Sequence, residues 1–102
     1  MINIYERQYK KDAILDETKK YRYVLTRQWR PDQNNFVNFI MLNPSTADDK
    51  IDDRTICKYV KFAKKWNYDG LYVTNLFAFR STNPLNLYHA KDPIGKENDS
   101  YL

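Results

Sequence analysis

The chain has 102 residues, of which 42% are apolar and 16% aromatic, so it fits one small packed domain and extensive disorder is excluded. The formal net charge is +4, with basic residues gathered around residues 10–30 and 58–65 and acidic ones around 48–53, a distribution that suits a nucleic acid or nucleotide partner. A single cysteine excludes an internal disulfide, and the charged start and short apolar runs indicate neither a signal peptide nor a membrane span. We therefore expect a cytoplasmic protein without a membrane partner.

The first half of the chain predicts two strands. Residues 1–20 show little periodicity, and we expect them to form an N-terminal arm before a single domain over residues 21–102. The alternation in YRYVLTRQWR predicts a strand over residues 21–30. The apolar run FVNFIML predicts a second strand over residues 36–42 that is covered on both faces. The turn-forming residues PDQNN between them predict an antiparallel hairpin.

The second half predicts a helix and another strand. Apolar residues recur at helical spacing over residues 56–66 with lysines on the opposite side, and Asp52 or Asp53 can cap the first turn. LYVTN predicts a strand over residues 71–75 that is parallel to the second strand, because strand–helix–strand segments with short links make right-handed crossovers. A helical turn is expected in PLNLYHA. The chain therefore predicts an α/β domain with a mixed, mainly parallel sheet.

Two asparagines follow the parallel strands directly. Asn43 and Asn75 stand at their carboxyl ends, where ligands bind in open α/β sheets, so we expect them to lie close together. Pro44 restricts the backbone of Asn43, and a carboxamide held in this way can position a water molecule or read a base edge. Ser45 and Thr46 add hydroxyl groups for a ligand. The alternative interpretation of this segment is a turn that leads into a helix cap.

Charged residues near these strand ends offer further chemistry. Arg80 follows the second asparagine in a loop, where a guanidinium group can hold a phosphate, although a lone arginine is more often a surface residue. Asp49, Asp52 and Asp53 could supply an acid or base, and capping is the competing interpretation. Their spacing matches no metal site, and with two glycines the chain lacks the loops that cofactors need, so we expect neither a metal nor a cofactor.

Several segments resemble a known family. MLNPSTADD, DDRTI, FAKKWNYDGLYVTNLFAFRSTNP and DPIG closely resemble domain-of-unknown-function family 1643, found in bacteria and phages, over roughly residues 21–102. More distantly, MLNPS and LYVTNLFAFR are similar to two motifs of the uracil-DNA glycosylase superfamily. This second resemblance implies a small three-layer sandwich in which Asn43 positions the attacking water and Asn75 reads the flipped base.

The chain also departs from the superfamily pattern. Met41 and Ser45 replace the glycines of the first motif, and the His-Pro-Ser motif that enters the DNA minor groove is missing, which predicts a fold truncated at the C-terminus. Three hypotheses stay open. The chain is a glycosylase-like hydrolase of an N-glycosidic bond, a non-catalytic nucleotide-binding or protein-interaction module of phage or host defence, or a structural homo-oligomer whose copies cover an incomplete sheet.

Overall fold

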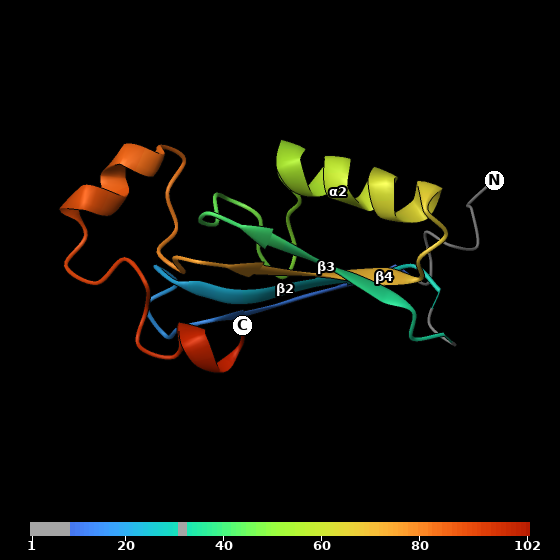
Figure 1. Ribbon diagram of the computed structural model, residues 1–102, viewed down its shortest axis with the longest axis horizontal. Helices are drawn as coiled ribbons and strands as arrows, with labels where there is room; N and C mark the ends of the chain where they lie inside the picture. The colour runs from blue at the N-terminus through green and yellow to red at the C-terminus, as the bar shows by residue number, and fades with distance from the viewer. Residues whose placement is uncertain (1–8, 31–32) are drawn as a thin grey trace.

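The computed structural model describes residues 9–30 and 33–102, which form a mixed β-sheet with one long helix on one face (Figure 1). The chain is therefore a small α/β domain, as predicted. In this described part no helix is long and apolar enough to cross a membrane. The elements are β1 (Lys10–Leu15), β2 (Arg22–Gln28), β3 (Phe36–Met41), α2 (Arg54–Lys65), β4 (Gly70–Asn75) and the short 3-10 helices η1 (Pro84–His89) and η2 (Asn98–Ser100).

The four strands lie in the order β1-β2-β4-β3. The predicted parallel pairing of the second strand with residues 71–75 is confirmed, since β3 and β4 run parallel up to the pair Met41–Asn75. The predicted hairpin is wrong, because the crossover through α2 places β4 between β2 and β3, where Leu25 pairs with Val73. The other two pairings in the described part are antiparallel, so the sheet is mixed but not mainly parallel.

The outer strand β1 lies in a segment for which an irregular arm was expected. Lys10–Leu15 pairs antiparallel with β2, and most of its side chains are exposed. The strand has little apolar alternation because it buries little surface, so its sequence carried only a weak signal. Residues 1–8 of the expected arm lie outside the described residues.

The core lies between α2 and the facing side of the sheet. The Asp53 side chain caps α2 by accepting a hydrogen bond from the Ile56 backbone N–H at 2.9 Å, which confirms one of the two predicted caps. Each large apolar side chain buried here stabilises the fold by about 1.5–3 kcal/mol. The buried residues are Leu25, Trp29, Ala47, Ile56, Val60, Ala63, Leu71 and Val73.

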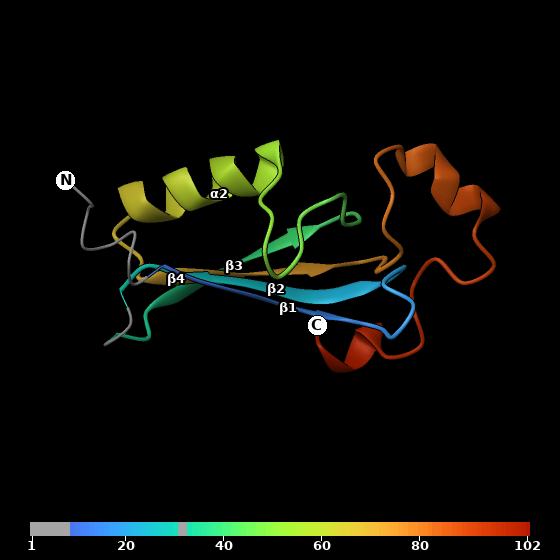
Figure 2. The same cartoon turned by 180° about the vertical axis from the view of Figure 1, so that it is seen from behind.

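The opposite face of the sheet is open over β3 and the neighbouring part of β4 (Figure 2). Ile40 is 61% exposed and Tyr72 is 44% exposed on this face. The prediction that residues 36–42 are covered on both faces is therefore wrong for the described part of the chain. The apolar run arises because alternate residues of β3 pack against the core on the helix side: Val37, Phe39 and Met41.

The C-terminal segment covers the carboxyl end of this open face, with η2 on the side of the sheet opposite α2 (Figure 1). The buried Asn98 side chain donates to the backbone carbonyls of Asn75 at 2.9 Å and Leu76 at 3.2 Å. The Tyr101 ring stacks on Tyr23 with their centroids 5.4 Å apart. These contacts fasten the end of the chain to the sheet.

The β1–β2 pairing shifts its register next to Arg22 and Tyr23, and the side chains of these two residues lie on opposite faces of the sheet. The shift leaves Tyr23 as an extra residue of β2, as in a β-bulge. Arg22 lies on the helix side, where it donates to the Ala47 carbonyl, while Tyr23 lies on the other side against Tyr101.

Candidate functional site

The connection from β3 to α2, residues 42–53, is called here the Asn-Pro loop, and three arginines hold it in place. Arg22 and Arg27 come from β2, and Arg80 follows β4. All three donate hydrogen bonds to backbone carbonyl groups, so the shape of the loop is fixed by buried or half-buried guanidinium groups. Arg80 bonds to the carbonyls of Ser45 (3.2 Å) and Thr46 (3.0 Å), Arg22 to Ala47 (3.0 Å), and Arg27 to Asp48 (2.6 Å) and Ile51 (3.3 Å).

A pocket of about 480 Å³ opens beside this loop at the carboxyl ends of β3 and β4, and we call it the carboxyl-end pocket. Its lining combines three cationic side chains, four hydroxyl groups and one aromatic ring. Such a combination suits a ligand that carries both an anionic group and a flat apolar part. The lining residues are Lys19, Lys20, Ser45, Thr46, Phe79, Arg80, Ser81 and Thr82.

The predicted ligand residues Ser45, Thr46 and Arg80 are therefore brought together in one pocket. The Arg80 side chain is less free to bind a phosphate than an unconstrained arginine, because it also donates to the Lys19 carbonyl at 3.0 Å. A guanidinium group has five N–H donors, and the three contacts to carbonyls occupy three of them. Two donors are left that can bind an anion in the pocket.

Lys19 and Lys20 come from the turn between β1 and β2, which Arg80 joins to the Asn-Pro loop. The Arg80 backbone N–H donates to the Lys20 carbonyl at 2.8 Å, while its side chain reaches Lys19. Both lysine side chains are exposed. They add positive charge at the pocket mouth without neutralising carboxylates in its lining, so the pocket attracts anions.

Asn43 lies behind the pocket, with its amide group turned inward. Its Nδ2 donates to the carbonyls of Pro44 at 3.1 Å and Ser81 at 3.0 Å, and the side chain is nearly buried. Because both partners are acceptors, the orientation of the amide is fixed, and among the described residues Oδ1 accepts no hydrogen bond. The contact with Ser81 ties the Asn-Pro loop to the residues that follow β4.

The parallel pairing of β3 and β4 brings Asn43 and Asn75 to neighbouring strand ends, as predicted. The Asn75 side chain, however, has other partners than that of Asn43. Its Nδ2 donates to the Arg22 carbonyl of β2 at 3.2 Å, and the side chain has no exposed surface. The two carboxamides therefore have different partners, and a base could touch Asn75 only if neighbouring groups moved. Its Oδ1 is buried without a partner among the described residues.

Arg22, whose backbone carbonyl accepts the hydrogen bond from Asn75, has a buried guanidinium group that donates to the Ala47 carbonyl of the Asn-Pro loop. Burial lowers the pKa of Arg22 to about 10, and the charge of Asp53 opposes part of that effect. Its Nε has no partner in the described residues, and its weakest contact is Nη2 to the Met41 sulfur at 4.0 Å. A buried charge with so few partners is costly.

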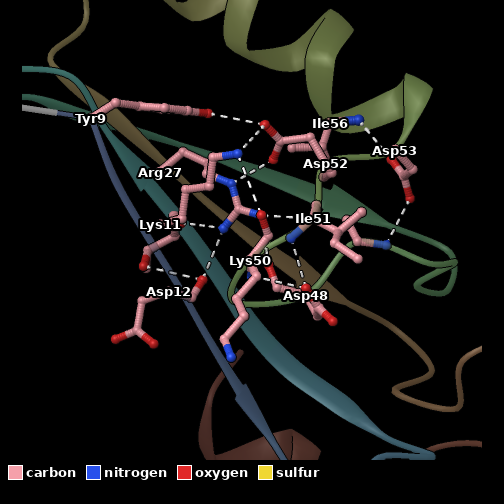
Figure 3. Close-up of polar contacts among 12 residues, drawn as sticks. Tyr9, Lys11, Asp12, Arg27, Asp48, Lys50, Ile51, Asp52, Asp53 and Ile56 are labelled. Atoms are coloured by element: carbon pink, nitrogen blue, oxygen red, sulfur yellow. Dashed lines mark hydrogen bonds and ion pairs between the residues drawn. The ribbon is translucent and has the colours of Figure 1, made fainter. Parts of the chain in front are cut away.

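Three of the four acidic residues of the loop, Asp48, Asp52 and Asp53, are engaged in structural contacts (Figure 3). Asp52 pairs with Arg27 at 2.7 Å and with Lys11 at 3.3 Å. Asp53 caps α2 and also accepts from the Ala47 backbone N–H at 3.2 Å. Asp49 is exposed, and like the other three it does not line the carboxyl-end pocket.

The sequence interpretation missed five of the eight pocket residues: Lys19, Lys20, Phe79, Ser81 and Thr82. Phe79, Lys19 and Lys20 reach the pocket because Tyr21 and Phe79 form an isolated antiparallel bridge. Phe79 is the last aromatic residue of LFAFR, so a signal was present in the same segment as Asn75. It could be recognised only once β2 and β4 were known to be neighbours.

A comparison with models of protein families assigns the chain to one family. Residues 22–102 match the family described as "Protein of unknown function (DUF1643)", and the chain belongs to this family. Neither the curated proteins nor the solved structures contain a match to the chain. The family assignment agrees with the resemblance seen in the sequence, and it carries no activity with it.

Proposed function

We propose that this chain binds a nucleotide, or a base presented by a nucleic acid, in the carboxyl-end pocket. The observation that carries the proposal is the convergence of three cationic residues, four residues with hydroxyl groups and Phe79 around one pocket. Lysine, arginine and hydroxyl groups are suited to phosphate oxygens, and an aromatic ring in such a pocket stabilises a stacked base by about 1–3 kcal/mol. The pocket volume falls within the range of small-molecule sites.

The Phe79 ring is held in place for this role. Its edge-to-face contact with Tyr21, with the ring centroids 5.7 Å apart, fixes it against the β1–β2 hairpin. The lysines of the same hairpin lie at the pocket mouth. A base on the ring and a phosphate near the lysines would thus be bound by one rigid unit, which lowers the entropy lost on binding.

The finer form of the proposal is a glycosylase-like fold and activity, in which this domain is part of a three-layer sandwich and hydrolyses an N-glycosidic bond. The free acceptor of Asn43 supports it, because Oδ1 can accept a hydrogen bond from a water molecule and orient it. The full burial of Asn75 favours binding without hydrolysis, since the superfamily uses that position to read the base. Binding is therefore the primary proposal and hydrolysis the second.

Binding is tested by calorimetric titration with a panel of deoxynucleoside monophosphates, inorganic phosphate and a short single-stranded DNA. Lys20→Glu reverses a charge at the pocket, and Lys58→Glu makes the same change on the exposed side of α2. We expect Lys20→Glu to weaken nucleotide binding by roughly ten-fold and Lys58→Glu by less than about two-fold. Absence of binding by the folded wild type at millimolar nucleotide, or equal loss in both variants, would overturn the proposal.

Hydrolysis is tested separately by mass spectrometry of free base released from uracil-containing and modified DNA. Release by the wild type but not by Asn43→Ala would establish the activity, provided that circular dichroism shows the variant to be folded. Silence across the panel from a protein that binds nucleotides would refute hydrolysis and leave the binding proposal standing.

A further inference from the structure

A second pocket, of about 430 Å³, lies on the face of the sheet opposite α2, between the β1–β2 turn and the C-terminal segment. Three tyrosines contribute to its walls: Tyr21, Tyr23 and Tyr101. We call it the tyrosine pocket. It shares no lining residue with the carboxyl-end pocket, although the turn of residues 16–20 borders both.

The walls of the tyrosine pocket are fixed by packing. Tyr23 and Tyr101 stack with an interplanar angle of 14°, and Asn98 fastens the segment that carries Tyr101 to the sheet. Gly95 completes the fold of this segment with a φ of 91°, a conformation that glycine adopts readily. The rings therefore do not need to be ordered by a ligand, which favours binding.

The charge of this pocket is opposite to that of the whole chain. Four carboxylates line it against a single ammonium group from Lys96, whereas the chain carries a net charge of +4. None of these carboxylates forms an ion pair with a described residue. The four acidic residues are Asp16, Glu17, Asp92 and Glu97.

The phenol groups in the wall respond to this negative potential. Burial and then the charges of Asp92 and Asp16 raise the pKa of Tyr21. The pKa of Tyr23 is likewise raised, first by burial and then by the charge of Asp16. A positive group in the pocket would find both a favourable potential and the electron-rich faces of aromatic rings.

The carboxylates of this pocket do not form a recognisable group of metal ligands among the described residues. Throughout residues 9–30 and 33–102, no three acidic, histidine or cysteine side chains gather closely enough to hold a metal. Asp16 already accepts from the Tyr21 backbone and the Thr18 hydroxyl, and Asp92 accepts from the Gly95 backbone. Glu17 and Glu97 are exposed, and their carboxylates are free of hydrogen bonds to described residues.

We propose that the tyrosine pocket binds an organic cation, with its guanidinium or alkylammonium group against the aromatic wall and its charge paired with Glu17 and Glu97. Aromatic faces and spread carboxylates together recognise such groups better than they recognise a small hydrated metal ion. The cation is supplied either by a free amine or by an arginine or lysine side chain of a protein. This site does not depend on nucleotide binding in the other pocket.

The experiment is an NMR titration of the full chain with N-acetyl-arginine amide, using N-acetyl-citrulline amide as the uncharged control ligand. We expect the cation to shift the ring signals of Tyr23 and Tyr101, and the neutral analogue to bind at least about five-fold more weakly. Equal binding of the two ligands, or no ring shifts at millimolar cation, would overturn the proposal.

Variants separate the pocket from general charge effects. The double change Glu17→Gln and Glu97→Gln should weaken cation binding by roughly five- to ten-fold, whereas Asp49→Asn, an exposed site on the far face, should change it by less than about two-fold. Tyr101→Leu keeps apolar bulk and should weaken binding by about three-fold through loss of the aromatic face. Equal effects of Asp49→Asn and the double variant would refute the site.

The source of the cation is decided by two further ligands. Binding of a blocked Gly-Arg-Gly peptide at least as tight as that of N-acetyl-arginine amide supports a protein side chain as the occupant. Binding of spermidine with exclusion of the peptide supports a free amine. Failure of all three cations contradicts the proposal.

Discussion

Arg27 is expected to be the residue on which the Asn-Pro loop depends most strongly. Its side chain has no exposed surface, and its Nε donates to Asp52 at 2.7 Å (Figure 3). Its other nitrogens donate to four backbone carbonyls, at Asp12, Thr26, Asp48 and Ile51. One guanidinium group thus joins β1, β2 and the loop that leads to α2.

The substitution Arg27→Met removes this group while keeping a similar apolar volume. It leaves the Asp52 carboxylate, which is 17% exposed, with the outer contact to Lys11 and a 3.5 Å contact from the Tyr9 hydroxyl. Breaking a buried ion pair in this way costs about 3–5 kcal/mol, and the stranded carbonyls add to the loss. Since a domain of this size is stable by about 5–15 kcal/mol, Arg27→Met should come close to unfolding it.

The matched control is Lys11→Met, which removes the outer partner of the same carboxylate. Lys11 is 32% exposed and lies 3.3 Å from Asp52, so its loss should cost no more than about 1 kcal/mol. Urea unfolding followed by the fluorescence of buried Trp29 measures both changes.

A double variant examines the reason for the loss. Asp52→Asn removes the charge that Arg27→Met leaves unpaired, so the pair of changes should cost less than the sum of the two single changes by at least about 1 kcal/mol. The reasoning is refuted if Arg27→Met is no more destabilising than Lys11→Met.

Three other outcomes follow from the same contacts. Asp53→Ala removes both the cap of α2 and the acceptor of the Ala47 N–H, and calorimetry should show a loss of about 1–2 kcal/mol, whereas Asp49→Ala should be neutral. Burial and the charge of Asp52 raise the pKa of Tyr9 to about 12, so the native state keeps this proton when the unfolded state loses it, and stability should fall between pH 10 and pH 12. Urea midpoints at pH 9 and pH 11.5 should show a smaller fall for Tyr9→Phe, and an equal fall would contradict the assignment. Asn43→Ala removes the hydrogen bonds to the Pro44 and Ser81 carbonyls and should destabilise by about 1–2 kcal/mol, with faster amide exchange at Ser81. Unchanged exchange would refute the idea that Asn43 holds Ser81 against the Asn-Pro loop.

Local patterns were sufficient to predict the elements next to the site. The period of residues 56–66 defined α2, and the acidic residues before it included the actual cap, Asp53. The strand–helix–strand order was likewise enough to predict that β3 and β4 are parallel. These features are local because helix periodicity, capping and crossover handedness depend on residues close together in sequence.

Long-range pairing could not be read in the same way. Nothing in the turn after residue 30 shows that β4 lies between β2 and β3, since that choice depends on which strand best buries Leu25 and Val73. The error also hid the carboxyl-end pocket, whose Lys19, Lys20 and Phe79 meet only when β2 and β4 are neighbours. The burial of Asn75 against Arg22 depends on the same strand pairing. The role of Asn75 in reading a base stays a prediction.

The most direct test of nucleotide binding is an amide-resolved NMR titration of the wild-type chain with deoxynucleoside monophosphates. Binding in the carboxyl-end pocket predicts shifts centred on the backbone amides of Ser45, Thr46, Arg80, Ser81 and Thr82, together with the Phe79 ring. The signals of the exposed side of α2 should stay unchanged. Shifts confined to α2 or to the tyrosine pocket, or none at millimolar nucleotide, would contradict the account.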